Sequence, residues 1–160
     1  MTRKDYEFII ASVGAFVTVI AAGFFSDLIL LNNSGTPIII ASTGASAMVV
    51  LGLPDSPVSR PWNLVGGHTF SAIVGVSCYQ FIPNELLAAS LSIPFSMIAM
   101  YFGRCMHPPG GATAITAVIG GVAINELGYM FVITPIFFNS LILLTVALGV
   151  ATFRKKNPFI

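Results

Sequence analysis

Charged side chains are scarce in this chain. Asp, Glu, Lys and Arg make up 8% of its 160 residues, hydrophobic residues make up 56%, and the mean hydropathy is +0.91. Soluble domains carry roughly 25% charged residues, so this composition excludes an ordinary soluble domain and indicates a membrane protein in contact with lipid. The formal net charge of +1 provides no basic surface for a nucleic acid.

Cysteines and catalytic motifs are scarce as well. Cys78 and Cys105 are the two cysteines, and both stand in apolar surroundings far apart in the sequence, which excludes a zinc-type cluster and a CxxC redox pair. We therefore expect no metal and no cofactor. The pattern HExxH and the pattern Gly-x-Ser-x-Gly do not occur, and the acids Asp27, Glu85 and Glu126 fall in separate turns, so we do not expect an enzyme.

Long hydrophobic runs dominate what remains. A helix needs about 20 residues to cross a bilayer, and residues 8–31, 63–82, 86–103 and 129–153 meet or approach that length. Residues 37–53 and 112–124 are shorter, and their sequences fit a span, a re-entrant segment or a loop. The charged start of the chain leads into a long apolar run without a convincing cleavage site, which predicts a retained first helix.

The positions of the basic residues favour six crossings. Lys and Arg concentrate on the cytoplasmic side of membrane proteins. If both shorter runs cross and the N-terminus is inside, all seven basic residues lie inside: Arg3, Lys4, Arg60, Arg104, Arg154, Lys155 and Lys156. With four crossings, Arg60 moves outside. We therefore predict an all-α polytopic helix bundle with both termini cytoplasmic, and the lack of a transit peptide favours a bacterial plasma (inner) membrane.

A short pattern of small residues occurs twice. Residues 43–47 (TGASA) resemble residues 110–114 (GGATA), and each copy opens an apolar segment in the middle of a group of three elements. One transmembrane domain over residues 1–160 would then contain two half-repeats, 8–82 and 86–153. Because each half has an odd number of crossings, the second would be inverted, giving a 3+3 inverted repeat. Chance recurrence and helix packing also account for such patterns.

Prolines next to both copies predict broken or short second and fifth elements. Pro37 precedes the first copy and Pro108 and Pro109 precede the second, and proline interrupts a helix upstream of itself. Two helices that start partway through the membrane from opposite faces would point their N-termini at each other near the midplane. Their first-turn N–H groups have no intrahelical partner and carry partial positive charge, so we expect a small-anion site there.

The side chains of this expected site are small or polar. Hydroxyls of Ser46 and Thr113 would donate to the anion, and Gly44, Gly110 and Gly111 would let the backbone approach it. Alternatively, both hydroxyls bond their own helices. The full set of expected binding residues is Thr43, Gly44, Ala45, Ser46, His68, His107, Gly110, Gly111, Ala112 and Thr113.

Two histidines and three polar residues complete the candidates. An imidazole of His107 or His68 can hydrogen-bond an anion or take up a proton; alternatively, His107 fastens a loop through a backbone carbonyl and His68 joins helices. Arg104, Asn63 and Arg60 are candidates for the pathway or its mouth. Their alternative roles are fixing topology for Arg104, capping the third helix for Asn63 and pairing with an acid for Arg60.

The run from residue 104 to 114, RCMHPPGGATA, resembles the signature of the HPP family of integral membrane proteins. Residues 42–47 (STGASA), 56–57, 61–63 and 66–68 (GGH) resemble that family's other segments. Trp62 is a departure, since many relatives carry a smaller or basic residue there. Members in plastids and cyanobacteria are implicated in nitrite transport, so the resemblance implies a carrier or channel for nitrite or a similar monovalent anion. A non-transporting structural or sensory subunit is the alternative, and we expect a homodimer because so small a protomer barely encloses a site.

Overall fold

The chain folds into helices joined by short connections. The computed structural model describes residues 2–30 and 40–154. Within these ranges the elements are α1 (Arg3–Leu30), α2 (Ala41–Gly52), the short helix η1 (Pro57–Ser59), α3 (Pro61–Phe81), α4 (Glu85–Phe102), α5 (Gly110–Ile119), α6 (Val122–Asn125), η2 (Val132–Phe137) and α7 (Phe138–Arg154). No strand occurs in the described ranges, so the all-α prediction is confirmed.

Helix length separates the elements into two kinds. In the described part of the chain, three helical segments are long and apolar enough to cross a membrane: Arg3–Leu28, Glu85–Phe102 and Val132–Arg154. The helices α2 and α5 have 12 and 10 residues, or about 18 and 15 Å, roughly half of a hydrocarbon core. The second and fifth elements are therefore short, as expected, while the count of six crossings stays a prediction.

Prolines set two breaks in the chain. Helix α4 ends at Phe102, and α5 begins directly after Pro109, at Gly110, two residues before the apolar run 112–124. The predicted span over residues 129–153 corresponds to the apolar segment Val132–Arg154, but it contains a kink that we did not predict: Thr134 has non-helical backbone angles (φ −129°, ψ 116°). A residue before proline avoids the α region, so Pro135 explains this kink. Pro37 lies outside the described residues, and α2 begins at Ala41, three residues before Gly44.

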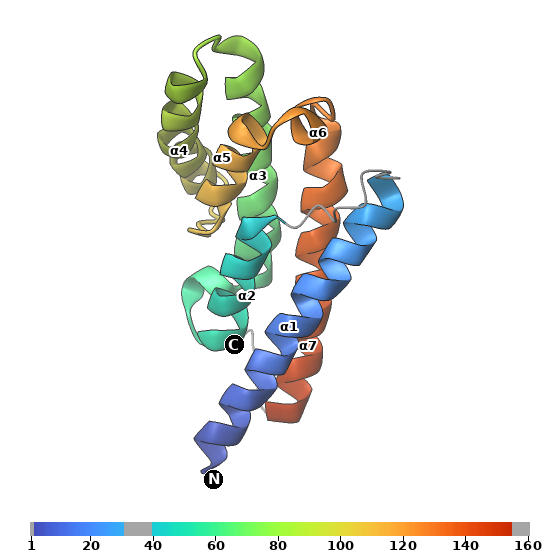
Figure 1. Cartoon of the computed structure of the whole chain (residues 1–160). Helices are drawn as coiled ribbons and strands as arrows, with labels where there is room; N and C mark the ends of the chain where they lie inside the picture. The colour runs from blue at the N-terminus through green and yellow to red at the C-terminus, as the bar shows by residue number, and fades with distance from the viewer. Residues whose placement is uncertain (1, 31–39, 155–160) are drawn as a thin grey trace.

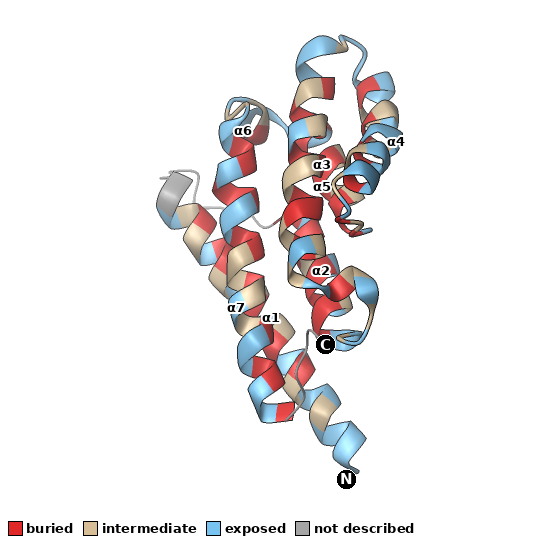
Figure 2. Cartoon of the chain, turned by 180° about the vertical axis from the view of Figure 1, so that it is seen from behind, coloured by how far each residue is buried: buried red, intermediate tan, exposed pale blue. Residues whose placement is uncertain are grey.

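The helices pack as two groups. Helix α1 lies against α2 and α7, whereas α3 lies against α4 and α5, and contacts of α2 with α5 and of α3 with η2 and α7 join the groups (Figure 1). Burial follows these contacts: buried positions face the neighbouring helices and exposed positions face outward (Figure 2). Many exposed side chains are large and apolar, including Phe8, Phe16 and Phe24 on α1. Such an apolar exterior is what a bilayer requires.

Successive long and short helices alternate in direction. In Figure 1, α1, α3 and α5 rise, whereas α2, α4 and α7 descend. The short helices α2 and α5 therefore run oppositely, and they start at about the same height, at the junction between the two groups. This arrangement places the two N-terminal turns against each other.

Candidate functional site

The N-terminal turns of α2 and α5 are joined by a buried hydrogen bond. Thr113, in the first turns of α5, donates from its hydroxyl to Ser42 Oγ, in the first turn of α2, over 2.8 Å. Both side chains are fully buried, at 0% and 1% exposure. The two small-residue segments thus lie together and run oppositely, which is the placement that the anion-site hypothesis requires.

Two histidines extend this contact into a continuous polar chain. His68 of α3 places Nδ1 2.7 Å from Thr113 Oγ1 and Nε2 2.6 Å from Ser46 Oγ. The same Ser46 oxygen lies 2.9 Å from His107 Nε2, and the two imidazole rings are 5.0 Å apart. We call Ser42, Thr113, His68, Ser46 and His107 the histidine–hydroxyl chain. All five side chains are buried, so every polar atom in it depends on its neighbours for hydrogen bonds.

Glycines of α3 allow the segment before α5 to come this close. A Cβ on Gly67 would lie 2.5 Å from His107 Cβ and 2.9 Å from the carbonyl oxygen of Cys105. A Cβ on Gly110 would lie 2.7 Å from Ser71 Oγ. Real Cβ atoms do not approach so closely, so the contacts between α3, the loop and α5 require residues without a side chain at these positions.

Side chains hold the irregular loop over residues 103–109. Trp62 Nε1 donates to the Gly103 carbonyl over 2.9 Å, and Asn63 Nδ2 donates to the Met106 carbonyl over 2.7 Å. His107 Nδ1 donates to the Val58 carbonyl over 2.8 Å. Non-helical backbone inside a membrane protein is tolerated where protein covers it and supplies its hydrogen bonds. These three bonds meet that requirement and fix the position of the His107 ring.

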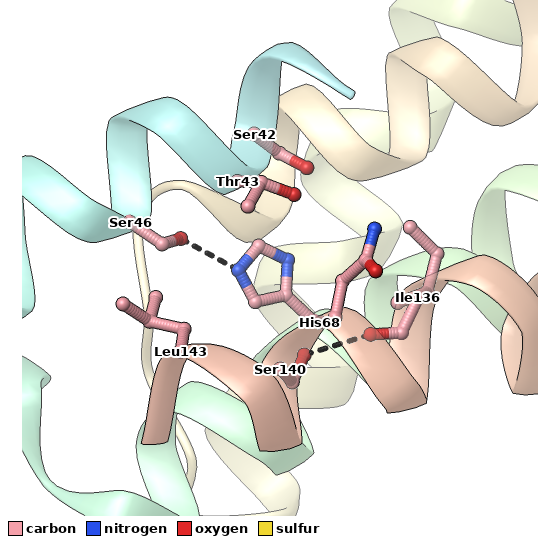
Figure 3. Close-up of a pocket in the computed structure, with 8 residues that line it drawn as sticks. Ser42, Thr43, Ser46, His68, Ile136, Ser140 and Leu143 are labelled. Atoms are coloured by element: carbon pink, nitrogen blue, oxygen red, sulfur yellow. Dashed lines mark hydrogen bonds between the residues drawn. The ribbon is translucent and has the colours of Figure 1, made fainter. Parts of the chain in front are cut away.

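A small cavity of about 10 Å³ lies beside the chain. That is about the space for one water molecule. Figure 3 shows His68 pointing into it from α3, opposite α2 and next to α7. Its lining holds hydroxyl, imidazole, amide and apolar groups and no carboxylate: Ser42, Thr43, Ser46, His68, Ile136, Asn139, Ser140 and Leu143.

Sequence reasoning missed three polar lining residues, Ser42, Asn139 and Ser140, and the apolar Ile136 and Leu143. Asn139 carried a usable signal, because a polar amide within an apolar run such as 129–153 is costly unless it faces protein or a cavity. Its side chain is buried and hydrogen-bonds Ser26 of α1, with atom separations of 3.3 and 3.4 Å. Ser140 donates to the Ile136 carbonyl of its own segment, 2.9 Å away.

The first-turn N–H groups of α5 are paired, contrary to our expectation. Those of Gly110, Gly111 and Ala112 donate to the carbonyls three residues earlier, over 2.9, 3.0 and 3.1 Å. The turn through Pro108 and Pro109 supplies these carbonyls, since both prolines retain their acceptors although they lack a donor. The donor that α5 brings to the site is therefore the Thr113 hydroxyl.

Several other expected binding residues lie away from the cavity. Ala45 is exposed, and a Cβ on Gly44 would have no described atom within 4 Å, so neither faces the cavity. Gly110 contacts α3, and a Cβ on Gly111 would lie 3.3 Å from Ile93 of α4, so these glycines serve helix packing. Ala112 is partly exposed on α5.

The residues expected at the pathway or its mouth lie outside the cavity, so their role in the pathway stays a prediction. Arg60 and Arg104 are exposed and do not line the cavity. The capping role of Asn63 was wrong: Arg60 is the N-cap residue of α3, without a side-chain cap, and Asn63 instead binds the loop at Met106. The cavity lies inside the bundle, whereas these residues lie near its surface, so they do not contact an anion held there.

Comparisons with known proteins agree with a membrane assignment. The family model for the HPP transmembrane region matches residues 2–159. Two transmembrane proteins of Dictyostelium discoideum are similar, one 38% identical over 76% of this chain and 44% of its own length, the other 34% identical over 78% and 41%. The chain thus spans less than half the length of these relatives. No solved structure matches it.

Proposed function

Because the chain belongs to the HPP family of integral membrane proteins, we propose that it transports a small monovalent anion, with nitrite as the first candidate. The observation that carries this proposal is the cavity lined by α2, α3, η2 and α7, which lies next to the contact between Ser42 and Thr113. The N-terminal turn of α2 lines it and carries the partial positive charge of a helix N-terminus, and α5 reaches it through Thr113, which hydrogen-bonds Ser42. Hydroxyl, amide and imidazole groups line it without a carboxylate, and this set of donors suits an anion.

The chemistry of this proposal is exchange of hydration for protein donors. An anion that enters the cavity loses water and gains hydrogen bonds from groups such as Ser42, Thr43 and Asn139. No covalent step is involved, so the protein is not an enzyme in this proposal. The cavity has room for about one water, and nitrite has three non-hydrogen atoms. Binding therefore requires the lining helices to move apart, which fits a carrier better than an open channel.

The helix contacts support two related halves that alternate in access. If α1, α2 and α7 correspond to α4, α5 and α3, the contacts of the two groups match. Helix α1 contacts α2 and α7 in one group, and α4 contacts α5 and α3 in the other. A pseudo-twofold arrangement around a central site is the usual design of inverted-repeat carriers. Residues 8–82 and 86–153 are the halves that we propose.

The proposed topology has six crossings, both termini on the cytoplasmic side of a bacterial inner membrane, and a homodimer as the working unit. The alternating helix directions in Figure 1 support an even number of crossings. Single cysteines at Thr2 and Glu85, in a background without Cys78 and Cys105, test it in oriented membrane vesicles, because Glu85 lies on the side opposite to Thr2 with six crossings and on the same side with four. An impermeant maleimide should label these two positions from opposite sides, and labelling from the same side would refute six crossings.

Uptake by proteoliposomes tests the function. Labelled nitrite should enter vesicles that contain the protein, and competition with nitrate, formate, bicarbonate and chloride should rank the anions. Thr113→Val and His107→Ala should each lower uptake by about tenfold, since each leaves buried partners of the lining residues Ser42, His68 or Ser46 unsatisfied, at a cost of about 1–3 kcal/mol. Thr145→Val is the matched control, because Thr145 is exposed and donates to its own helix. No uptake by a folded wild-type protein would favour the structural or sensory subunit.

A further inference from the structure

We infer that the histidine–hydroxyl chain takes up one proton whenever the cavity takes up an anion, so that the protein moves a proton and a monovalent anion together as an electroneutral pair. The inference rests on the proposed transport function and adds a second transported species to it. It follows from counting hydrogens along the chain of buried hydrogen bonds.

The Thr113 hydroxyl determines where the hydrogen of His68 lies. A hydroxyl has one hydrogen to donate, and Thr113 donates its hydrogen to Ser42 over 2.8 Å. The contact of 2.7 Å between Thr113 Oγ1 and His68 Nδ1 must then use a hydrogen on the ring nitrogen. His68 therefore carries a hydrogen on Nδ1 in this arrangement.

The contacts of His107 and Ser46 determine the remaining ring hydrogens. Its Nδ1 lies 2.8 Å from the Val58 carbonyl, which only accepts, so this nitrogen carries a hydrogen. Between the two rings, Ser46 Oγ contacts Nε2 of His68 at 2.6 Å and Nε2 of His107 at 2.9 Å. Ser46 donates its single hydrogen to one of these nitrogens, so the other nitrogen must donate to Ser46. One of the two rings then carries hydrogens on both nitrogens and is an imidazolium.

The same atoms form a second complete arrangement with one proton fewer. If Ser42 donates to Thr113, then Thr113 donates to His68 Nδ1, His68 Nε2 donates to Ser46, and Ser46 donates to His107 Nε2. Every bond is then satisfied with two neutral rings. The two arrangements differ by one proton, and the direction in which Ser42 donates decides between them.

Ser42 links this choice to the anion because it lines the cavity. When Thr113 donates to Ser42, the hydrogen of Ser42 is released to point at an anion. When Ser42 donates to Thr113, it offers the cavity only lone pairs, which repel an anion. An anion at Ser42 thus favours the arrangement with the extra proton, and by reciprocity the extra proton favours the anion.

The charge of the imidazolium also favours binding of the proton and the anion together. A buried imidazolium is costly without a partner of opposite charge, and the described groups that line the cavity include no carboxylate. The groups that face the rings from α2, α5 and α7 are hydroxyls and an amide. Other titratable or charged groups of the neighbouring elements do not line the cavity: Asp27, Asp55, Arg60, Glu85, Arg104 and Cys105. The transported anion is therefore the available counter-charge for the added proton.

Simultaneous measurement of nitrite uptake and electrical current tests the inference. Proteoliposomes adsorbed on a solid-supported electrode receive a nitrite pulse, and labelled nitrite is counted in parallel, with protein-free liposomes subtracted to remove nitrous acid that crosses the lipid. Co-transport of one proton with each nitrite should give protein-dependent uptake without net current, together with alkalinisation outside. Uptake that carries one negative charge per nitrite would overturn the inference and leave the anion-transport proposal standing. Absence of protein-dependent uptake would remove both.

Ser42→Ala separates the proton step from general damage. Without the Ser42 hydroxyl, Thr113 is released to donate to His68, and the remaining chain is satisfied with neutral rings. We expect the uptake that remains in this variant to carry current. Ser90→Ala should behave as wild type, because Ser90 is exposed and donates to Leu86 of its own helix. Electroneutral uptake at the wild-type rate in Ser42→Ala would overturn the assignment of Ser42 as the link.

Discussion

The short helices α2 and α5 carry similar small-residue sequences and meet through Ser42 and Thr113, but the protein holds them differently. Helix α5 lies backbone to backbone against α3, where a Cβ on Gly75 would be 2.5 Å from the Ala114 carbonyl oxygen. Helix α2 packs against α1 and α7, exposes Ala45 and Met48, and leaves Gly44 without a described atom within 4 Å of its Cβ position.

This difference indicates which helix moves. The segment before α5 is fastened by Trp62, Asn63 and His107, and its first amides are paired with loop carbonyls. A displacement of α5 would open its close backbone contacts with α3, whereas the glycines of α2 make no such contact and a displacement of α2 breaks side-chain bonds such as those of Ser42 and Ser46. We therefore expect α2, together with α1 or α7, to open the cavity while α3 and α5 form the fixed wall.

Gly75→Ala should have the largest effect on stability, because it disturbs the close packing of α3 on α5. The new Cβ would meet backbone atoms of Ala114 at 2.5 and 2.8 Å, which cannot rotate away as a side chain can. Overpacking of this kind costs about 3 kcal/mol, so the midpoint of thermal unfolding in detergent should fall clearly. Gly149→Ala is the control, since a Cβ there meets nothing within 4 Å. Equal midpoints for the two variants would contradict the tight packing of α3 on α5.

Ser46→Ala should come next, because Ser46 is the α2 residue that contacts both histidines. Removing its hydroxyl leaves two buried ring nitrogens without this partner, at 2.6 and 2.9 Å in the wild type. Leaving a buried polar group unsatisfied costs about 1–3 kcal/mol. Thr113→Val removes contacts to one ring nitrogen and one hydroxyl, so its unfolding midpoint should fall less. A midpoint for Ser46→Ala above that for Thr113→Val would invert this ranking.

A smaller effect on stability is expected for the polar pair that joins α1 to α7. Ser26 and Asn139 are 3.3–3.4 Å apart and buried. Hydrogen bonds between membrane helices average about 0.6 kcal/mol in double-mutant cycles. The cycle of Ser26→Ala, Asn139→Ala and the double variant should therefore give a coupling of about 0.6 kcal/mol in unfolding experiments. Strict additivity would show that the pair does not hold α1 and α7 together.

The sequence predicted the placement of the site better than its chemistry. The prolines before Gly110 and the repeated small residues predicted two short helices, and α2 and α5 are short and meet at Ser42 and Thr113. Local rules on proline suffice for this, since they act within a few residues. The pairing of the first α5 amides and the contacts of Gly110 with α3 depend on tertiary packing, which a single sequence does not reveal.

Asn139 and the kink at Thr134 illustrate the same limit for the last segment. The apolar run over residues 129–153 predicted a membrane span, and its hydropathy gave no sign of a kink inside it. The kink follows from Pro135, whose effect on the preceding residue is a local rule that our prediction of the span did not use. The role of Asn139 depends on α1 and the cavity, and both partners are distant in the sequence.

Gly44→Ala should have the smallest effect and sharpens the contrast between the two helices. Alanine is favoured over glycine inside a helix by about 1 kcal/mol, and a Cβ here meets no described atom within 4 Å, so the unfolding midpoint should stay level or rise slightly. Nitrite uptake should not change, because Gly44 faces away from the cavity. A folded Gly44→Ala protein with reduced uptake would mean that the anion, or a moving part of the protein, approaches the α2 backbone during transport. Gly44 would then allow a close approach to the backbone of α2, as Gly67 and Gly75 allow close approaches to the backbone of α3.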